Sequence, residues 1–114
     1  MIDVTVNVEV EGTYGVKLQD DTWELNIHAA PDDLRNLTGI RDATWAEGRS
    51  LRIGTCAGAP VWWCEQGDSV TILVGDDDQV WDAAVTVSLS TVHEILRLTE
   101  QVKDEVQHGH AFDA

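Results

Sequence analysis

The chain has 114 residues, and its 21 Asp and Glu outnumber its 7 Lys and Arg, which gives a formal net charge of −14. This length fits one domain, and an apolar content of 43% is close to the globular average, so a packed core is expected. Nucleic acid is excluded because its phosphates are bound by clustered Lys and Arg, and a membrane is excluded because no apolar run approaches roughly 20 residues.

The first thirty residues predict three antiparallel strands. Valines at positions 4, 6, 8 and 10 alternate with polar residues, and a period of two is typical of a half-buried strand. Turns are expected at Glu11–Thr13, where Gly12 can adopt a positive φ, and at Gln19–Thr22. A four-residue loop at the second turn would pair Leu18 with Trp23 and keep the apolar side chains on one face.

The middle of the chain predicts a short helix followed by four strands. Pro31 and the two aspartates after it suit the first turn of a helix. This helix is expected to run from about Pro31 to Leu37, with residues 38–50 irregular or weakly helical. The last hairpin is expected to pair Val74 with Trp81. The four predicted strands are Leu51–Cys56, Val61–Cys64, Ser69–Val74 and Val80–Leu89.

The C-terminal quarter predicts a long helix. Thr91 and Glu94 have the spacing of a capping box, and an apolar stripe at helical spacing runs from Val92 to about Val106. The predicted fold is therefore α+β, a two-layer antiparallel meander of about seven strands with a short middle helix and a long C-terminal helix packed on it. Residues 1–106 are expected to form a single domain and residues 107–114 a flexible C-terminal tail.

Two cysteines, Cys56 and Cys64, are too few for a disulfide scaffold or a four-cysteine zinc site. A turn at Gly58–Ala59 would place Cys56 opposite Trp62 and leave the cysteines as diagonal neighbours about 7–8 Å apart, too far for a disulfide. The N-terminus lacks the basic and apolar segments of a secretory signal. We therefore expect a cytoplasmic protein with two reduced thiols.

No catalytic or metal-binding motif stands out. The chain lacks a G-x-S-x-G elbow and a Walker loop, and Asp76–Asp78 lacks the alternating acids and terminal Glu of a calcium loop. Cys56 could be paired with His28 or His93 as a base, but its apolar strand favours a small buried residue instead. We expect no catalytic residues, no metal and no cofactor.

The acidic residues are unevenly distributed. Residues 61–89 carry six acids and no base. Such a field accelerates the encounter with a basic protein. Two other interpretations stay open, namely that the acids are solvated turns that serve solubility, or that the whole proteome is adapted to salt. The candidate partner-binding acids are Asp76, Asp77, Asp78 and Asp82.

Trp62 and Trp63 are also candidate partner-binding residues. Adjacent residues of a strand point to opposite faces, so if helices cover one face, one of the two rings is exposed or needs another cover. Trp is favoured at binding hot spots because it buries a large area with few rotatable bonds. The alternative is that both faces are covered, or that the ring lies under long side chains.

The stretch from Leu51 to Leu98 resembles, in layout, the small immunity proteins of actinobacterial polymorphic toxin systems. The resemblance lies in the spacing of glycines and aromatic residues. It implies tight binding that occludes the active site of a cognate toxin, with no catalytic residues. The segments that carry it are Leu51–Gly54, Gly58, Val61–Trp63, Leu73–Gly75, Val85–Val87 and Thr91–Val92.

The leading hypothesis is a non-enzymatic acidic binding protein, an inhibitor or immunity protein that neutralises a basic cognate toxin or another basic protein by occlusion. The acids of the Asp76–Asp78 turn and Asp82 would steer the partner, and Trp62 or Trp63 would anchor it. The alternative is a self-associating structural or regulatory module, a homodimer formed through the exposed sheet face. A small enzyme or ligand-binding domain is a third hypothesis, which needs a pocket with titratable groups of shifted pKa.

Overall fold

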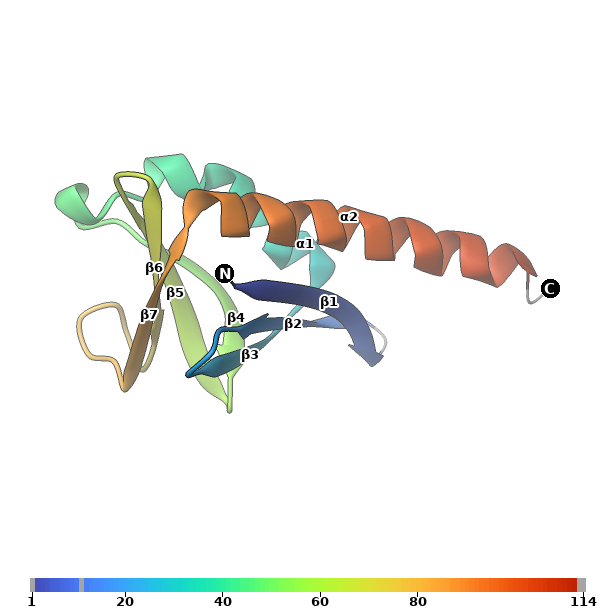
Figure 1. The fold of residues 1–114 in the computed structure, drawn as a ribbon, viewed down its shortest axis with the longest axis horizontal. Helices are drawn as coiled ribbons and strands as arrows, with labels where there is room; N and C mark the ends of the chain where they lie inside the picture. The colour runs from blue at the N-terminus through green and yellow to red at the C-terminus, as the bar shows by residue number, and fades with distance from the viewer. Residues whose placement is uncertain (1, 11, 113–114) are drawn as a thin grey trace.

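The computed structural model describes residues 2–10 and 12–112, with side chains described up to Val106. Seven strands form one antiparallel sheet in which each strand pairs with the next along the chain, and the predicted α+β meander is confirmed (Figure 1). The strands are β1 (Asp3–Val10), β2 (Thr13–Gln19), β3 (Glu24–Ala29), β4 (Leu51–Cys56), β5 (Ala59–Gln66), β6 (Ser69–Val74) and β7 (Ala83–Ser88). The helices are α1 (Pro31–Arg35), the 3-10 segments η1 (Asn36–Asp42) and η2 (Trp45–Glu47), and α2 (Leu89–Phe112).

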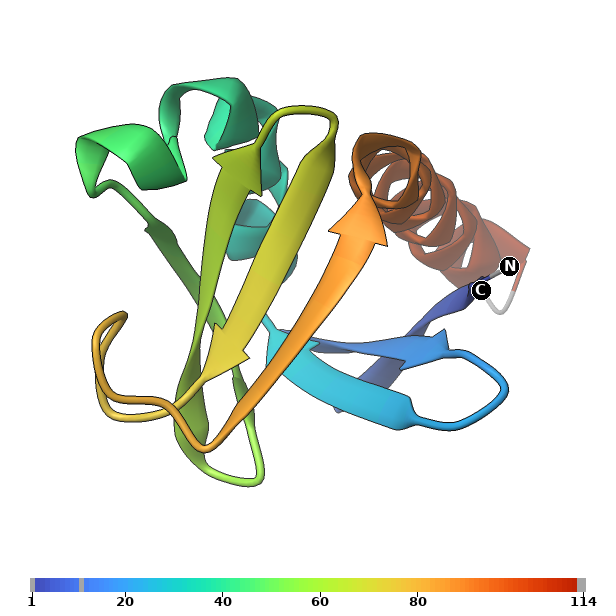
Figure 2. The same cartoon turned by 60° about the vertical axis from the view of Figure 1, so that its left-hand side comes forward.

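The sheet bends sharply between β3 and β4. These strands share a single residue pair, His28 with Thr55, whereas β2–β3 and β4–β5 share six and four pairs. The three-stranded half, β1–β3, therefore crosses the four-stranded half, β4–β7, at a steep angle (Figure 2). The helices occupy the concave side, where α2 runs from the end of β7 back across β1 (Figure 1).

The short middle helix is α-helical for less of its length than predicted. α1 ends at Arg35, and the chain continues as the 3-10 segment η1 to Asp42. Leu34, Leu37 and Ile40 are buried at intervals of three residues. A 3-10 helix has three residues per turn, so this geometry places all three side chains on the side that faces the core.

The β2–β3 hairpin has a different register from the one predicted. Leu18 pairs with Leu25 and not with Trp23, because Trp23 belongs to the turn, where its carbonyl accepts the Asp20 N–H at 2.9 Å. A shift of two residues leaves each side chain on its predicted face. In the preceding turn, Gly12 has the expected positive φ, 81°, and residue 11 lies outside the described residues.

The β4–β5 hairpin places the cysteines farther apart than predicted. Cys56 pairs with Ala59 and not with Trp62, because Ala57–Gly58 forms a two-residue turn with φ of 51° and 85°. Positive φ at both central residues is the signature of a type I′ hairpin. Cys64 lies five residues beyond Ala59, which is about 17 Å along the strand. Both thiols are free.

α2 begins earlier and ends later than predicted. It starts at Leu89, directly after β7. The Ser88 hydroxyl contacts those of Ser90 and Thr91 at 2.7 and 3.2 Å, so the predicted cap Thr91 lies inside the first turn. The helix runs to Phe112 and not to about Val106, so residues 107–112 of the predicted tail are helical, and residues 113–114 lie outside the described residues.

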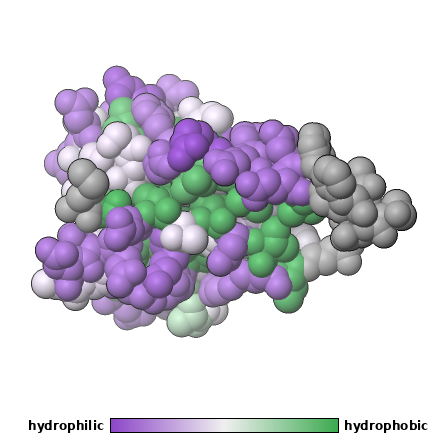
Figure 3. All heavy atoms as spheres, turned by 45° about the vertical axis from the view of Figure 1, so that its right-hand side comes forward, coloured by the Kyte–Doolittle hydropathy of each residue, from purple (hydrophilic) through white to green (hydrophobic). Residues whose placement is uncertain are grey.

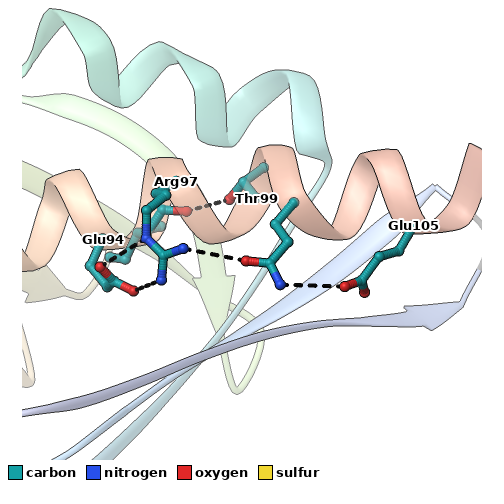
Figure 4. Close-up of polar contacts among 6 residues, drawn as sticks. Glu94, Arg97, Thr99 and Glu105 are labelled. Carbon is teal, nitrogen blue, oxygen red and sulfur yellow. Dashed lines mark hydrogen bonds and ion pairs between the residues drawn. The ribbon is translucent and has the colours of Figure 1, made fainter.

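The two sides of α2 differ in polarity. On the core side, the Thr99 hydroxyl donates to the Ile95 carbonyl at 2.7 Å (Figure 4). On the solvent side, Arg97 pairs with Glu94 and also donates to Gln101 at 3.3 Å. Side chains three and four residues apart stabilise a helix in this way. Within the described residues, no helix is both long and apolar enough to cross a membrane.

Candidate functional site

The outer face of the sheet, opposite the helices, carries a second buried cluster. Cys64 and Leu73 are 0% and 1% exposed, yet they alternate along their strands with Trp63 and Ile72, which belong to the main core. The segment Gly75–Asp82, which joins β6 to β7, brings Asp78 near enough for its charge to act on Cys64. Burial, and to a smaller extent the charge of Asp78, raises the pKa of the Cys64 thiol. This cysteine is therefore a neutral packing residue.

The structure separates the two tryptophans predicted as anchors. Trp63 has no exposed surface, and its indole N–H donates to the Ile53 carbonyl at 3.0 Å. Of the two rings predicted as alternative anchors, Trp63 has no surface to offer a partner, because its ring fills the main core. Trp62 is half-buried on the outer face, where its N–H donates to the Gly75 carbonyl at 3.2 Å and the Arg52 guanidinium lies 5.8 Å from the ring centre. Trp62 is thus a ring held under a long side chain.

The four candidate aspartates lie together in the segment Gly75–Asp82, but they make different contacts. One Asp77 carboxylate oxygen accepts the N–H groups of residues 79 and 80, each at 2.7 Å, and so shapes the loop. Asp78 accepts the Ser50 hydroxyl at 2.9 Å and ties the loop to the segment before β4. Asp76 and Asp82 are exposed, and so is Asp77, although one of its oxygens is bound within the loop. The charges of Asp76 and Asp82 face solvent and can act on a partner.

Gly75 allows the loop to fold back on the sheet. A Cβ at this position would lie 2.4 Å from the Cα of Trp81 and 2.5 Å from the carbonyl oxygen of Val80. Any other residue would therefore force the backbone apart. The loop closes at Val74, which pairs with Ala83 and not, as predicted, with Trp81. This register also differs from the prediction by two residues, so the faces of β7 are as expected.

The loop presents an exposed aromatic pair that the sequence did not predict. Trp81, from the loop, and Trp45, from η2, pack edge to face with ring centres 6.3 Å apart and an interplanar angle of 75°. Each remains 42% exposed, and the neighbouring Val80 is 63% exposed. A tryptophan beside an Asp-rich turn was a usable signal for Trp81. Nothing in the sequence pairs it with Trp45, which lies in a segment without periodicity.

These residues define one surface, which we call the acidic–aromatic surface. It combines two ordered indole rings with a branched apolar side chain and two solvent-facing carboxylates. The rings are held by each other, and the loop that carries Trp81 is held by its own hydrogen bonds and by Gly75. The surface consists of Trp45, Trp81, Val80, Asp76 and Asp82.

A polar hollow lies on another part of the molecule. It has a volume of about 400 Å³, and its lining includes His28, Asp33 and Arg52. The Nδ1 atom of His28 contacts the Glu9 carboxylate. The hollow is a shallow trough, and Cys56, the thiol considered as a nucleophile, is not part of its lining. Among the side chains described up to residue 106, no group of three or more His, Cys, Asp or Glu is arranged to hold a metal ion.

Comparisons of the chain with protein-family models, curated proteins and solved structures found no match. The resemblance of Leu51–Leu98 to immunity proteins therefore stays a prediction. Any function must be argued from the surface itself, and the acidic–aromatic surface is the region that combines exposed hot-spot side chains with charge.

Proposed function

We propose that this protein is a non-enzymatic binding protein that uses the acidic–aromatic surface to dock on a basic protein. The observation that carries the proposal is the Trp45–Trp81 pair, two large rings left 42% exposed, in which Trp81 belongs to a segment with exposed aspartates. A soluble domain that leaves two indoles in contact with water forgoes their burial unless a partner supplies it. Burial of the rings would supply most of the binding affinity, and the carboxylates would raise the rate at which the partner associates.

The chemistry of the surface favours Lys and Arg side chains in the partner. A cation over an indole ring gains about 0.5–2 kcal/mol, depending on how far it is desolvated. Asp76 and Asp82 lie in the same segment as Trp81, so a cation bound at the rings is close to a carboxylate. The formal charge of −14 adds a long-range field that accelerates the approach of a basic molecule and weakens as salt is added.

The immunity-protein resemblance supplies the most specific form of this proposal. The partner would be a basic toxin domain, and the protein would neutralise it in the cytoplasm by covering its active site. A rigid surface built from a loop on a sheet suits occlusion, because little is lost in ordering it on binding.

The test compares two charge variants of equal net charge as baits. In Asp76→Asn/Asp82→Asn the acidic–aromatic surface loses its two carboxylates, and in Asp21→Asn/Asp104→Asn the same charge is removed from the β2–β3 turn and α2. Each immobilised protein is incubated with a lysate of the source organism at low and moderate salt, and retained proteins are identified by mass spectrometry. We expect a basic protein that is retained by the wild type and the control and lost by the first variant.

Two results would reject the proposal. One is equal recovery of the same proteins by both charge variants. The other is recovery of the same proteins by Trp45→Ala/Trp81→Ala, since the rings are the claimed anchor. Association rates measured with the purified partner then separate steering from docking, because removed carboxylates lower the association rate and removed rings raise the dissociation rate.

Self-association is a second candidate, because a different surface favours it. Val8, Val10 and Val106 are exposed apolar side chains on β1 and α2, and Figure 3 shows a hydrophobic band between two hydrophilic borders on one face of the molecule. Burial of this band against a second copy would give a homodimer. Sedimentation over a dilution series tests it, since a monomer at all concentrations removes the candidate.

A further inference from the structure

β7 leaves one edge of the sheet open. Within the described residues it pairs with β6 alone, through six consecutive residue pairs from Val74–Ala83 to Ser69–Ser88. Just beyond the strand, the Leu89 N–H donates to the Asp68 carbonyl at 2.8 Å. Backbone groups of an antiparallel strand alternate between its two sides, so residues 83, 85 and 87 bond to β6. The N–H and C=O groups of residues 84, 86 and 88 point to the open edge.

This edge lacks three features that usually prevent pairing with another chain. Edge strands are normally protected by charged side chains, proline or a bulge. β7 contains only Ala, Val, Thr and Ser, and its pairing shows no register shift between Ala83 and Ser88. β1, at the other end of the sheet, carries Asp3 and Glu9 and a register shift between Val8 and Val10. The two edges are therefore unequal, and β7 is the one able to accept a strand.

A groove of about 510 Å³ runs beside the C-terminal part of β7. It is lined by Thr86–Ser88 of β7, by Ile2 and Val4 at the start of the chain, and by Thr91 and Glu94 of α2. A strand added to β7 would lie about 4.8 Å from it, inside this groove. Its inward side chains would meet Ile2 and Val4, which are only partly buried. A single extended segment fits this space, whereas a whole second copy would have to bring its own domain against β1.

We infer that the open edge of β7 binds an extended segment of the basic partner by strand addition. The identity of the partner rests on the proposed function, but the pairing chemistry depends on β7 alone. Inward side chains of the segment are apolar and small. Lys or Arg lies at its ends, because Asp82 immediately precedes β7 and Glu94 lines the groove beside the C-terminal part of the strand.

The inference is tested with the synthetic peptide acetyl-KVTVTVK-amide and amide hydrogen exchange measured by NMR. Without peptide, the amides of residues 84 and 86 exchange faster than those of 83, 85 and 87. With saturating peptide, exchange at Ala84 and Thr86 slows at least tenfold, while Thr5 on β1 is unchanged. The variant Thr86→Lys binds the peptide at least tenfold more weakly, and its matched control, Thr5→Lys on the other edge strand, binds as the wild type does.

Several results would overturn the inference. If exchange at Ala84 and Thr86 stays unchanged when the peptide is added, strand addition is rejected. If an N-methylated peptide protects these amides equally well, pairing through the backbone is rejected. If a peptide with glutamates at both ends binds with the same affinity as the lysine peptide, the claim that the bound segment is basic is rejected. Protection that rises with protein concentration in the absence of peptide assigns the edge to a second copy. The proposed function fails separately, through the bait variant Trp45→Ala/Trp81→Ala, whose substitutions lie outside β7 and outside the lining of the groove.

Discussion

Substitution of Gly75 by Ala tests how the loop Gly75–Asp82 is held on the sheet. The φ of Gly75 is not positive, so the cost of a methyl group here is steric and not conformational. The new Cβ would lie 2.4 Å from the Cα of Trp81, where ordinary contacts begin at 3.4 Å, so the backbone must move by about 1 Å. Because the obstacle is backbone and not the tip of a flexible side chain, the strain cannot be relieved by a rotamer change.

Overpacking of this kind costs about 1–3 kcal/mol. Each kcal/mol lowers the melting temperature of a domain of this size by roughly 4 °C or more. The displacement also moves Trp81 away from Trp45, so the near-ultraviolet circular dichroism of the edge-to-face pair is expected to weaken. Urea unfolding monitored by far-ultraviolet circular dichroism gives the free energy of unfolding directly.

The matched control is Gly39→Ala. A Cβ at Gly39 would meet nothing within 4 Å, and φ is not positive there either, so this change is expected to be neutral or slightly stabilising. If Gly75→Ala loses no more stability than Gly39→Ala and keeps its near-ultraviolet spectrum, the loop does not depend on the close approach at Gly75. The account of how Trp81 is positioned would then be incorrect.

Three further predictions follow from burial and charge. Trp63→Ala lowers the free energy of unfolding in urea by about 3–5 kcal/mol, because it leaves a cavity in the main core. Under native conditions a thiol reagent labels the half-buried Cys56 and leaves Cys64 unlabelled. Burial and the charge of Asp78 raise the pKa of Cys64, so its thiol is not in the reactive thiolate form. The hydrogen bond to Arg97 lowers the pKa of Glu94, so this pair stabilises α2 above pH 4.5 and stops doing so as the pH falls through the lowered value. An NMR titration of Glu94 is expected to show a higher pKa in Arg97→Ala.

The sequence pattern was sufficient for the faces of the strands and insufficient for their registers. A one-residue slip would have placed Glu24 among the apolar side chains of the first hairpin, so alternation excluded it. A slip of two residues leaves the alternation intact, and only the turn can decide it. In the β2–β3 and β6–β7 hairpins, whose registers differ from the prediction by two residues, the turn was set by hydrogen bonds that residue types do not predict, such as the Trp23 carbonyl accepting the Asp20 N–H. In the β4–β5 hairpin the partner of Cys56 differs by three residues, because the turn is Ala57–Gly58 and not Gly58–Ala59.

The candidate site was predictable only in part, for a similar reason. The cluster of acids was visible as a run of charge, and it does lie in one loop. The aromatic component was assigned to the adjacent Trp62 and Trp63 because neighbouring strand residues face opposite ways. The rule left open which ring is buried, and the structure places Trp63 in the core. The exposed pair joins Trp81 to Trp45 from a different part of the chain. Because both residues lie in irregular segments, no periodicity of the sequence predicts this contact.

The single residue pair between β3 and β4 has a mechanical consequence. Two halves of a sheet that share His28 and Thr55 alone are joined by their common packing more than by a ladder of backbone bonds. Twisting one half against the other would slide side chains past each other without breaking a row of amide contacts. At this seam Gly54 has a φ of 84°, and a Cβ there would lie 2.6 Å from Ile27. The joint therefore depends on the packing of side chains that both halves share, and it leaves no room for added bulk.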